Sequence, residues 1–152
     1  MTKQIIYFDM DGVLVDLAKK IATYPKEYVA QFEADDTIEQ LPDLFSGAVP
    51  IKGAIEAFNK FCESGKYDCY ILSTAPWDAP WVWMQKREWV EKYIGKNAYK
   101  RLILSHNKNL NIGDYLIDDR TKNGAGEFRG ELIQFGTETY PDWDSVLNYL
   151  KP

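Results

Sequence analysis

Short apolar runs, most of them followed by polar residues, constrain the fold of this chain more than any other feature. Four clear runs cover residues 5–8, 69–72, 102–104 and 115–117, and a weaker one covers 131–135. Continuous apolar runs of this length are typical of strands buried on both faces. Helical patterns separate them, over residues 54–62, after Asp78 and after Asp142, and these two aspartates are the expected N-caps of their helices. The alternation predicts an α/β fold of the Rossmann-like type, a parallel sheet with helices on both faces.

Residues 17–50 interrupt this alternation. They contain helical pieces broken by Pro25 and Pro42, and Thr37 and Gln40 have the spacing of a capping box. We therefore expect one domain over residues 1–152, with a core of 1–16 and 51–152 and a small helical cap insertion over about 17–50. A chain of 152 residues is long enough to bury a core without disulfides or a structural metal.

Charge and hydropathy narrow the class of partner. The net charge is −5 and the pI about 4.9, which opposes the clustered basic surface that long nucleic acids need. A small phosphorylated ligand requires only a local positive charge. No segment approaches 18 apolar residues and the start has no long apolar run, so we expect a cytoplasmic protein without membrane contact. The oligomeric state stays open, and a homodimer is allowed.

Polar residues gather where the predicted strands end. In open parallel sheets, ligands bind beyond the carboxyl ends of the strands, so these side chains should share one crevice. Carboxylates brought together in this way repel one another unless a cation lies between them, and their hard oxygen ligands suit Mg²⁺. The residues are Asp9, Asp11, Ser73, Thr74, Lys108, Asp118 and Asp119.

This set of side chains can carry out phosphoryl transfer. Asp9, directly after the first strand, is a candidate covalent nucleophile towards phosphorus. Asp11 lies two residues further on and can protonate the leaving oxygen, then deprotonate the attacking water. Phosphate oxygens need hydrogen-bond donors and a compact positive charge, which we expect from Ser73, Thr74 and Lys108.

The same residues resemble the four motifs of the haloacid dehalogenase (HAD) superfamily. Residues 9–16 look like the first motif, Ser73 like the second, Lys108 like the third and the pair Asp118-Asp119 like the fourth. Dehalogenases of the superfamily lack an aspartate at the position of Asp11, and its transport ATPases carry threonine there. The resemblance therefore implies a phosphatase or phosphomutase.

A closer resemblance is to the 5′(3′)-deoxyribonucleotidases, through residues 89–95 and 116–120 and the spacing of the motifs. It implies Mg²⁺ bound by the side chains of Asp9 and Asp119 and the backbone carbonyl of Asp11. Asp118 would then act next to these ligands without binding the metal itself. It also implies nucleoside monophosphates as substrates. The insertion is shorter than the family's cap, so the base pocket cannot be matched residue by residue.

Two other functions fit part of the pattern. One is a phosphatase for another small phosphate ester or for a nucleic-acid end. The other is a non-catalytic phospho-acceptor domain of the receiver type. In receivers the acidic pair ends the first strand, whereas here the pair Asp118-Asp119 comes late and Asp11 follows the acceptor, which favours turnover.

Aromatic side chains are the candidates for nucleobase stacking. They are frequent in the insertion and in the segment after Ser73. Trp77 and Phe45 are the first candidates, although packing in the core would also explain such residues.

Overall fold

Five parallel strands form a single sheet in the computed structural model, which describes residues 2–152. Met1, part of the predicted core, lies outside the described residues. The sheet has the order β3-β2-β1-β4-β5, so that β1 lies at its centre. The predicted runs all form strands, and the α/β fold class is confirmed. The strands are β1 (Gln4–Phe8), β2 (Tyr67–Ser73), β3 (Leu102–Leu104), β4 (Tyr115–Asp118) and β5 (Glu131–Gln134).

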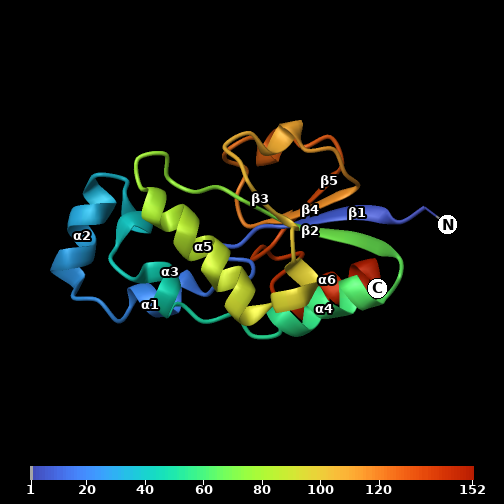
Figure 1. Cartoon of the computed structure of the whole chain (residues 1–152), viewed down its shortest axis with the longest axis horizontal. Coiled ribbons are helices and arrows are strands. Elements are labelled where there is room, and N and C mark those ends of the chain that lie inside the picture. The colour runs from blue at the N-terminus through green and yellow to red at the C-terminus, as the bar shows by residue number, and fades with distance from the viewer. Residues whose placement is uncertain (1) are drawn as a thin grey trace.

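Three α-helices cover one face of the sheet (Figure 1). Alternate side chains of β1 point to this face, where Phe8 packs against Phe58 at 4.9 Å and against Trp143 at 5.8 Å between ring centroids. The aromatic contacts anchor the central strand to two helices that follow it much later in the sequence. The helices are α4 (Ala54–Glu63), α5 (Pro80–Tyr93), which continues into η2 (Gly95–Ala98), and α6 (Trp143–Leu150).

Short 3₁₀ helices and loops cover the opposite face, where the sequence analysis predicted helices. Tyr7 and Leu116 of the sheet pack there against Ala125 and Phe128. The covering elements are η3 (Lys108–Leu110) and η4 (Ala125–Glu127). The segment that contains η4 is short and has glycines at 124, 126 and 130, which oppose a regular helix.

The helix starts follow the sequence only in part. Asp142 caps α6 as predicted, accepting the backbone N–H of Ser145 at 2.9 Å. Asp78 does not cap α5, because that helix starts later, with Ala79 as its N-cap residue and Pro80 in its first turn. Proline suits the first helical position and keeps the residue before it out of the helical conformation, which moves the start past Asp78.

The insertion lies at the end of the molecule opposite both termini, beyond the carboxyl ends of the strands (Figure 1). The predicted capping box at Thr37 is wrong: η1 is a single turn, and the Thr37 hydroxyl donates to the Phe32 carbonyl at 3.4 Å instead. Among residues 2–152, no helix has both the length and the apolar character needed to cross a membrane. The insertion consists of α1 (Leu17–Ile21), α2 (Lys26–Ala34), η1 (Ile38–Gln40) and α3 (Leu44–Gly47).

Candidate active site

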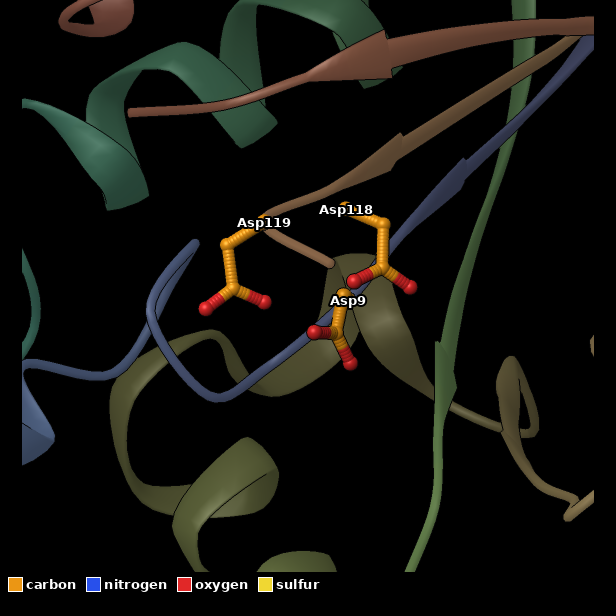
Figure 2. Close-up of side chains that lie close together, drawn as sticks. All are labelled: Asp9, Asp118 and Asp119. Carbon is orange, nitrogen blue, oxygen red and sulfur yellow. The ribbon is translucent and has the colours of Figure 1, made fainter. Parts of the chain in front are cut away.

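Three aspartates meet at the carboxyl ends of β1 and β4 (Figure 2). The two strands are neighbours and pair Phe8 with Ile117, so the residues that follow these two come side by side. Carboxylate oxygens of Asp9, Asp118 and Asp119 all lie within 4.8 Å of one another. Adjacent strands therefore bring together acids that are more than a hundred residues apart in sequence.

A tight turn carries the chain from Asp9 back past Asp119. The carbonyl of Met10 accepts hydrogen bonds from the backbone of Val13 and Val15 at 3.1 and 2.8 Å. Gly12 has φ +75°, and a Cβ atom there would lie 2.3 Å from Asp119 Oδ2. Only glycine allows the backbone this conformation and this approach to the carboxylate.

Lys108 holds two of the acids. Its ammonium group is buried and donates to Asp9 Oδ1 at 3.1 Å and to Asp118 Oδ2 at 2.5 Å. Its backbone N–H donates to the carbonyl of Asn123 at 2.8 Å, which anchors η3 to the loop after β4. Burial alone would lower the pKa of Lys108, but the charges of Asp9 and Asp118 outweigh it and raise the pKa, so the group is a cation at neutral pH.

The three acids of this cluster carry more negative charge than Lys108 can balance. Burial, followed by the charges of the neighbouring acids, raises the pKa of Asp119 to about 7 and that of Asp118 to about 6. Oδ1 of Asp119 is buried and has no hydrogen-bond partner among residues 2–152. A divalent cation would supply both the missing charge and the missing partner, and oxygen ligands of this kind fit Mg²⁺.

Lys86, on α5, is a member of the site that the sequence analysis missed. Its side chain is fully buried and its ammonium group donates to Asp11 Oδ2 and to the hydroxyl of Ser73, both at 3.1 Å. It also donates to the backbone carbonyl of Thr74. Burial raises the pKa of Asp11 to about 7, with the charge of Lys86 acting in the opposite direction.

The two hydroxyl residues predicted to contact phosphate lie at the carboxyl end of β2, Ser73 as its last residue and Thr74 directly after it, and both have partners within the protein. Ser73 is buried and accepts the hydrogen bond from Lys86. Thr74 is half-buried, and its hydroxyl donates to the Ser105 carbonyl at 2.7 Å. Their contact with a phosphate stays a prediction.

The two aromatic candidates for base stacking have different environments. Phe45 is fully buried and lies under the Lys86 ammonium group, 4.8 Å from its ring centroid, so its selection as a base contact was wrong. The sequence could not show that α3 packs this ring into the core. Trp77 is 77% exposed and lies 6.4 Å from the ring of His106.

A cavity of about 460 Å³ adjoins the acids. Asp11, Gly12 and Asp119 form one side of it, and an ion pair between Arg120 and Glu39, 4.0 Å apart, lies along it. A larger depression of about 720 Å³, near the end of α5, contains none of the acids. Apart from Glu39 of the ion pair, the insertion residues that line the smaller cavity are aliphatic: Leu17, Ala18, Ile21 and Ile38.

Comparisons with known proteins point to one family of enzymes. Residues 38–144 match the family described as "5' nucleotidase, deoxy (Pyrimidine), cytosolic type C protein". A protein of Vibrio phage KVP40 named "Putative 5'(3')-deoxyribonucleotidase" is 56% identical over 97% of this chain and 85% of its own length. The human mitochondrial 5'(3')-deoxyribonucleotidase is 26% identical over 93% of this chain and 68% of its own length.

The fold has solved counterparts. The magnesium-bound Bacillus subtilis protein YfnB, described as a "putative HAD-hydrolase", superposes with a TM-score of 0.69 over the whole of both chains, at 10% identity. At that identity the match concerns the fold alone. Together, the match to the family and the phage relative show that the chain belongs to the 5′(3′)-deoxyribonucleotidase family, a family of phosphoric monoester hydrolases, and its fold is that of HAD hydrolases.

Proposed function

We propose that this chain removes phosphate from deoxyribonucleoside monophosphates through an aspartyl-phosphate on Asp9, with the help of Mg²⁺. One observation carries the proposal. Asp9 belongs to the metal-type cluster of acids and accepts a hydrogen bond from the Lys108 cation, while Asp11, two residues on, has one carboxylate oxygen, Oδ1, without a partner among residues 2–152.

In the first step, a carboxylate oxygen of Asp9 attacks phosphorus and the bond from phosphorus to the sugar oxygen breaks. The leaving alkoxide takes a proton from Asp11, whose raised pKa allows the carboxyl group to hold that proton near neutral pH. Lys108 stabilises the charge that develops on the phosphoryl oxygens. The nucleoside then leaves, and the phosphoryl group is bound to Asp9.

In the second step, water attacks the phosphorus of the acyl phosphate and gives its proton to Asp11. The bond between phosphorus and the Asp9 oxygen breaks, which releases inorganic phosphate and restores the Asp9 carboxylate. Asp11 is protonated again at the end, ready for the next substrate. The same residue therefore acts first as acid and then as base.

The side chains of Asp9 and Asp119 and the backbone carbonyl of Asp11 would hold Mg²⁺. Bound there, the ion would supply positive charge that offsets the charge of the phosphate. We expect Asp119→Ala to weaken Mg²⁺ affinity by more than about 100-fold. Asp118→Ala should weaken it by roughly tenfold, the lower end of the losses for residues that contact the ligands but do not bind the metal. Calorimetric titration of both variants with Mg²⁺ measures this difference. An unchanged affinity in Asp119→Ala would reverse the assignment.

The cavity beside the acids is the proposed site of the nucleoside. It adjoins Asp11, which protonates the leaving sugar oxygen, and its insertion wall is aliphatic apart from Glu39. An apolar wall favours the flat faces of a base and the carbons of deoxyribose. Trp77 does not line this cavity.

Truncation of the cavity wall should therefore affect nucleotides selectively. We expect Leu17→Ala to lower kcat/KM for deoxyribonucleoside monophosphates by roughly tenfold, the low end of discrimination by a hydrophobic pocket. Hydrolysis of ribose 5-phosphate should change less than twofold, since that substrate lacks the base. Trp77→Ala is the matched comparison and should leave the nucleotide preference unchanged. If the preference for nucleotides were lost in Trp77→Ala and kept in Leu17→Ala, the base would contact the exposed Trp77 ring instead of the cavity wall.

A substrate screen with Mg²⁺ tests the proposed function as a whole. The panel contains deoxyribonucleoside 5′- and 3′-monophosphates, ribonucleotides, sugar phosphates and 5′-phosphorylated oligonucleotides. We expect the deoxyribonucleoside monophosphates to give the highest kcat/KM. Greater activity on oligonucleotide ends or on sugar phosphates would still support a phosphatase but would contradict a nucleotidase.

A further inference from the structure

Lys86 is the one member of the site whose role the reaction described above does not require. It projects from α5, and its side chain is completely buried. Its ammonium group reaches three different parts of the protein: the Asp11 carboxylate, the end of β2 and, through a cation–π contact, the Phe45 ring of the insertion. No other lysine among residues 2–152 is so completely buried.

Stability alone does not account for this lysine. A buried ammonium group loses its hydration, at a cost of several kcal/mol that an ion pair offsets only with good geometry and further hydrogen bonds. Here all three N–H donors have protein acceptors, on Asp11, Ser73 and Thr74. An apolar side chain of similar volume often fills such a position with equal or greater stability. The charged group therefore calls for a functional explanation.

The pattern of bonds on Asp11 gives that explanation. Oδ2 of Asp11 accepts from Lys86 at 3.1 Å, whereas Oδ1 is buried and has no partner among residues 2–152. A carboxyl group that exchanges protons with a substrate needs one free oxygen in a fixed direction. Because Lys86 also binds Ser73 and Thr74, it fixes that direction relative to the end of β2, where phosphate contacts are expected.

We propose that Lys86 is a positioning residue for the general acid. It holds Oδ2 of Asp11 against the end of β2 and so directs Oδ1 to the leaving oxygen of the substrate. The inference rests on the proposed function, in which Asp11 protonates that oxygen. The three donors of Lys86 are all on protein acceptors, which leaves none for a phosphate, so its removal should change reactions only in so far as they depend on Asp11.

Single-turnover measurements of two leaving groups test this role. A nucleotide releases a poor alkoxide and requires the acid, whereas 4-nitrophenyl phosphate releases a good leaving group and requires it far less. We expect Lys86→Met to slow nucleoside release by roughly 10²-fold, the lower part of the range for a general acid, and nitrophenol release by less than about fivefold. Lys92→Met, on an exposed part of the same helix, is the control and should behave like wild type.

A double-mutant cycle with Asp11→Asn distinguishes positioning from a general structural effect. If Lys86 acts through Asp11, adding Lys86→Met to Asp11→Asn should slow nucleoside release by less than about threefold more. Multiplied losses in the double variant, or equal losses on both substrates in Lys86→Met, would overturn the proposal. Lys86→Gln keeps two of the donors without the charge and should lose less than Lys86→Met, which provides a second variant if methionine prevents folding.

The proposal and the function on which it rests fail in different ways. A wild-type protein that hydrolyses no nucleotide would refute the proposed function, whatever the variants do. A wild-type nucleotidase whose activity survives Lys86→Met within twofold, while Asp11→Asn is impaired, would refute only the role of Lys86.

Discussion

Replacement of Asp9 by asparagine should abolish phosphatase activity while the protein stays folded. The amide keeps the size of the side chain but cannot form an acyl phosphate, so we expect kcat to fall by roughly 10⁶-fold, the scale of loss on removing an enzymic nucleophile. Lys108 keeps its bond to Asp118 at 2.5 Å in the variant, so one carboxylate still balances the buried cation. Steady-state kinetics with Mg²⁺ and a nucleotide measure the loss, and circular dichroism measures the fold.

Asp144→Asn is the matched control for this variant. Asp144 lies in an exposed position of α6, so the same chemical change there should leave kcat unchanged. Activity of Asp9→Asn within tenfold of wild type would exclude Asp9 as the nucleophile. If Asp9→Asn does not fold, Asp9→Glu is the alternative variant. It keeps the carboxylate but displaces it by one methylene group, and we expect its activity to be similarly low.

Asp11→Asn should cause a large loss that depends on the leaving group. We expect nucleotide turnover to fall by roughly 10²–10⁴-fold, the usual contribution of general acid–base catalysis. Phosphoenzyme formation from an aryl phosphate should fall much less, because its leaving group needs no proton. Rapid-quench measurement of the first turnover separates that step from hydrolysis of the phosphoenzyme.

The two steps give a second expectation for the same variant. Since Asp11 is also the base that activates water, Asp11→Asn should accumulate the phosphoenzyme when supplied with an aryl phosphate. Equal slowing of the first step for nucleotide and aryl phosphate would contradict a leaving-group role for Asp11.

The sequence predicted the sheet and the acids of the site for the same physical reason. A strand buried on both faces must be continuously apolar, so its end is visible where a charge first appears, as it does at Asp9 and Asp118. Parallel strands then bring these ends to one edge without any detailed knowledge of packing. The helix starts were less predictable, because Pro80 rather than the nearby Asp78 sets the start of α5.

Lys86 was missed because a lysine in a helix is normally read as a surface residue. A signal was nevertheless present: Lys86 lies four residues after Val82 and three before Trp89, on the apolar stripe of its helix. A single charged residue on such a stripe marks either a break in the pattern or a buried charge with a partner. The partner, Asp11, lies seventy-five residues away, and only the tertiary structure identifies it.

The substrate contacts of the insertion were the least predictable part. The aromatic composition of residues 17–50 suggested ring stacking, yet Phe45 packs into the core and aliphatic side chains face the cavity. Helices of four to nine residues present no long periodic pattern, so the side that each one buries depends on how they pack together. That arrangement comes from the three-dimensional structure alone.

Chemical identification of the phosphorylated residue tests the central claim most directly. Asp11→Asn protein is mixed with 4-nitrophenyl phosphate and Mg²⁺, quenched in acid, digested and mapped by mass spectrometry, with Asp9→Asn/Asp11→Asn treated in parallel. We expect one phosphoryl group on the peptide that contains Asp9, formed at the rate of the nitrophenol burst and absent from the double variant. Release of nitrophenol and phosphate without a phosphorylated peptide, or a phosphoryl group on any other residue, would contradict the aspartyl-phosphate mechanism.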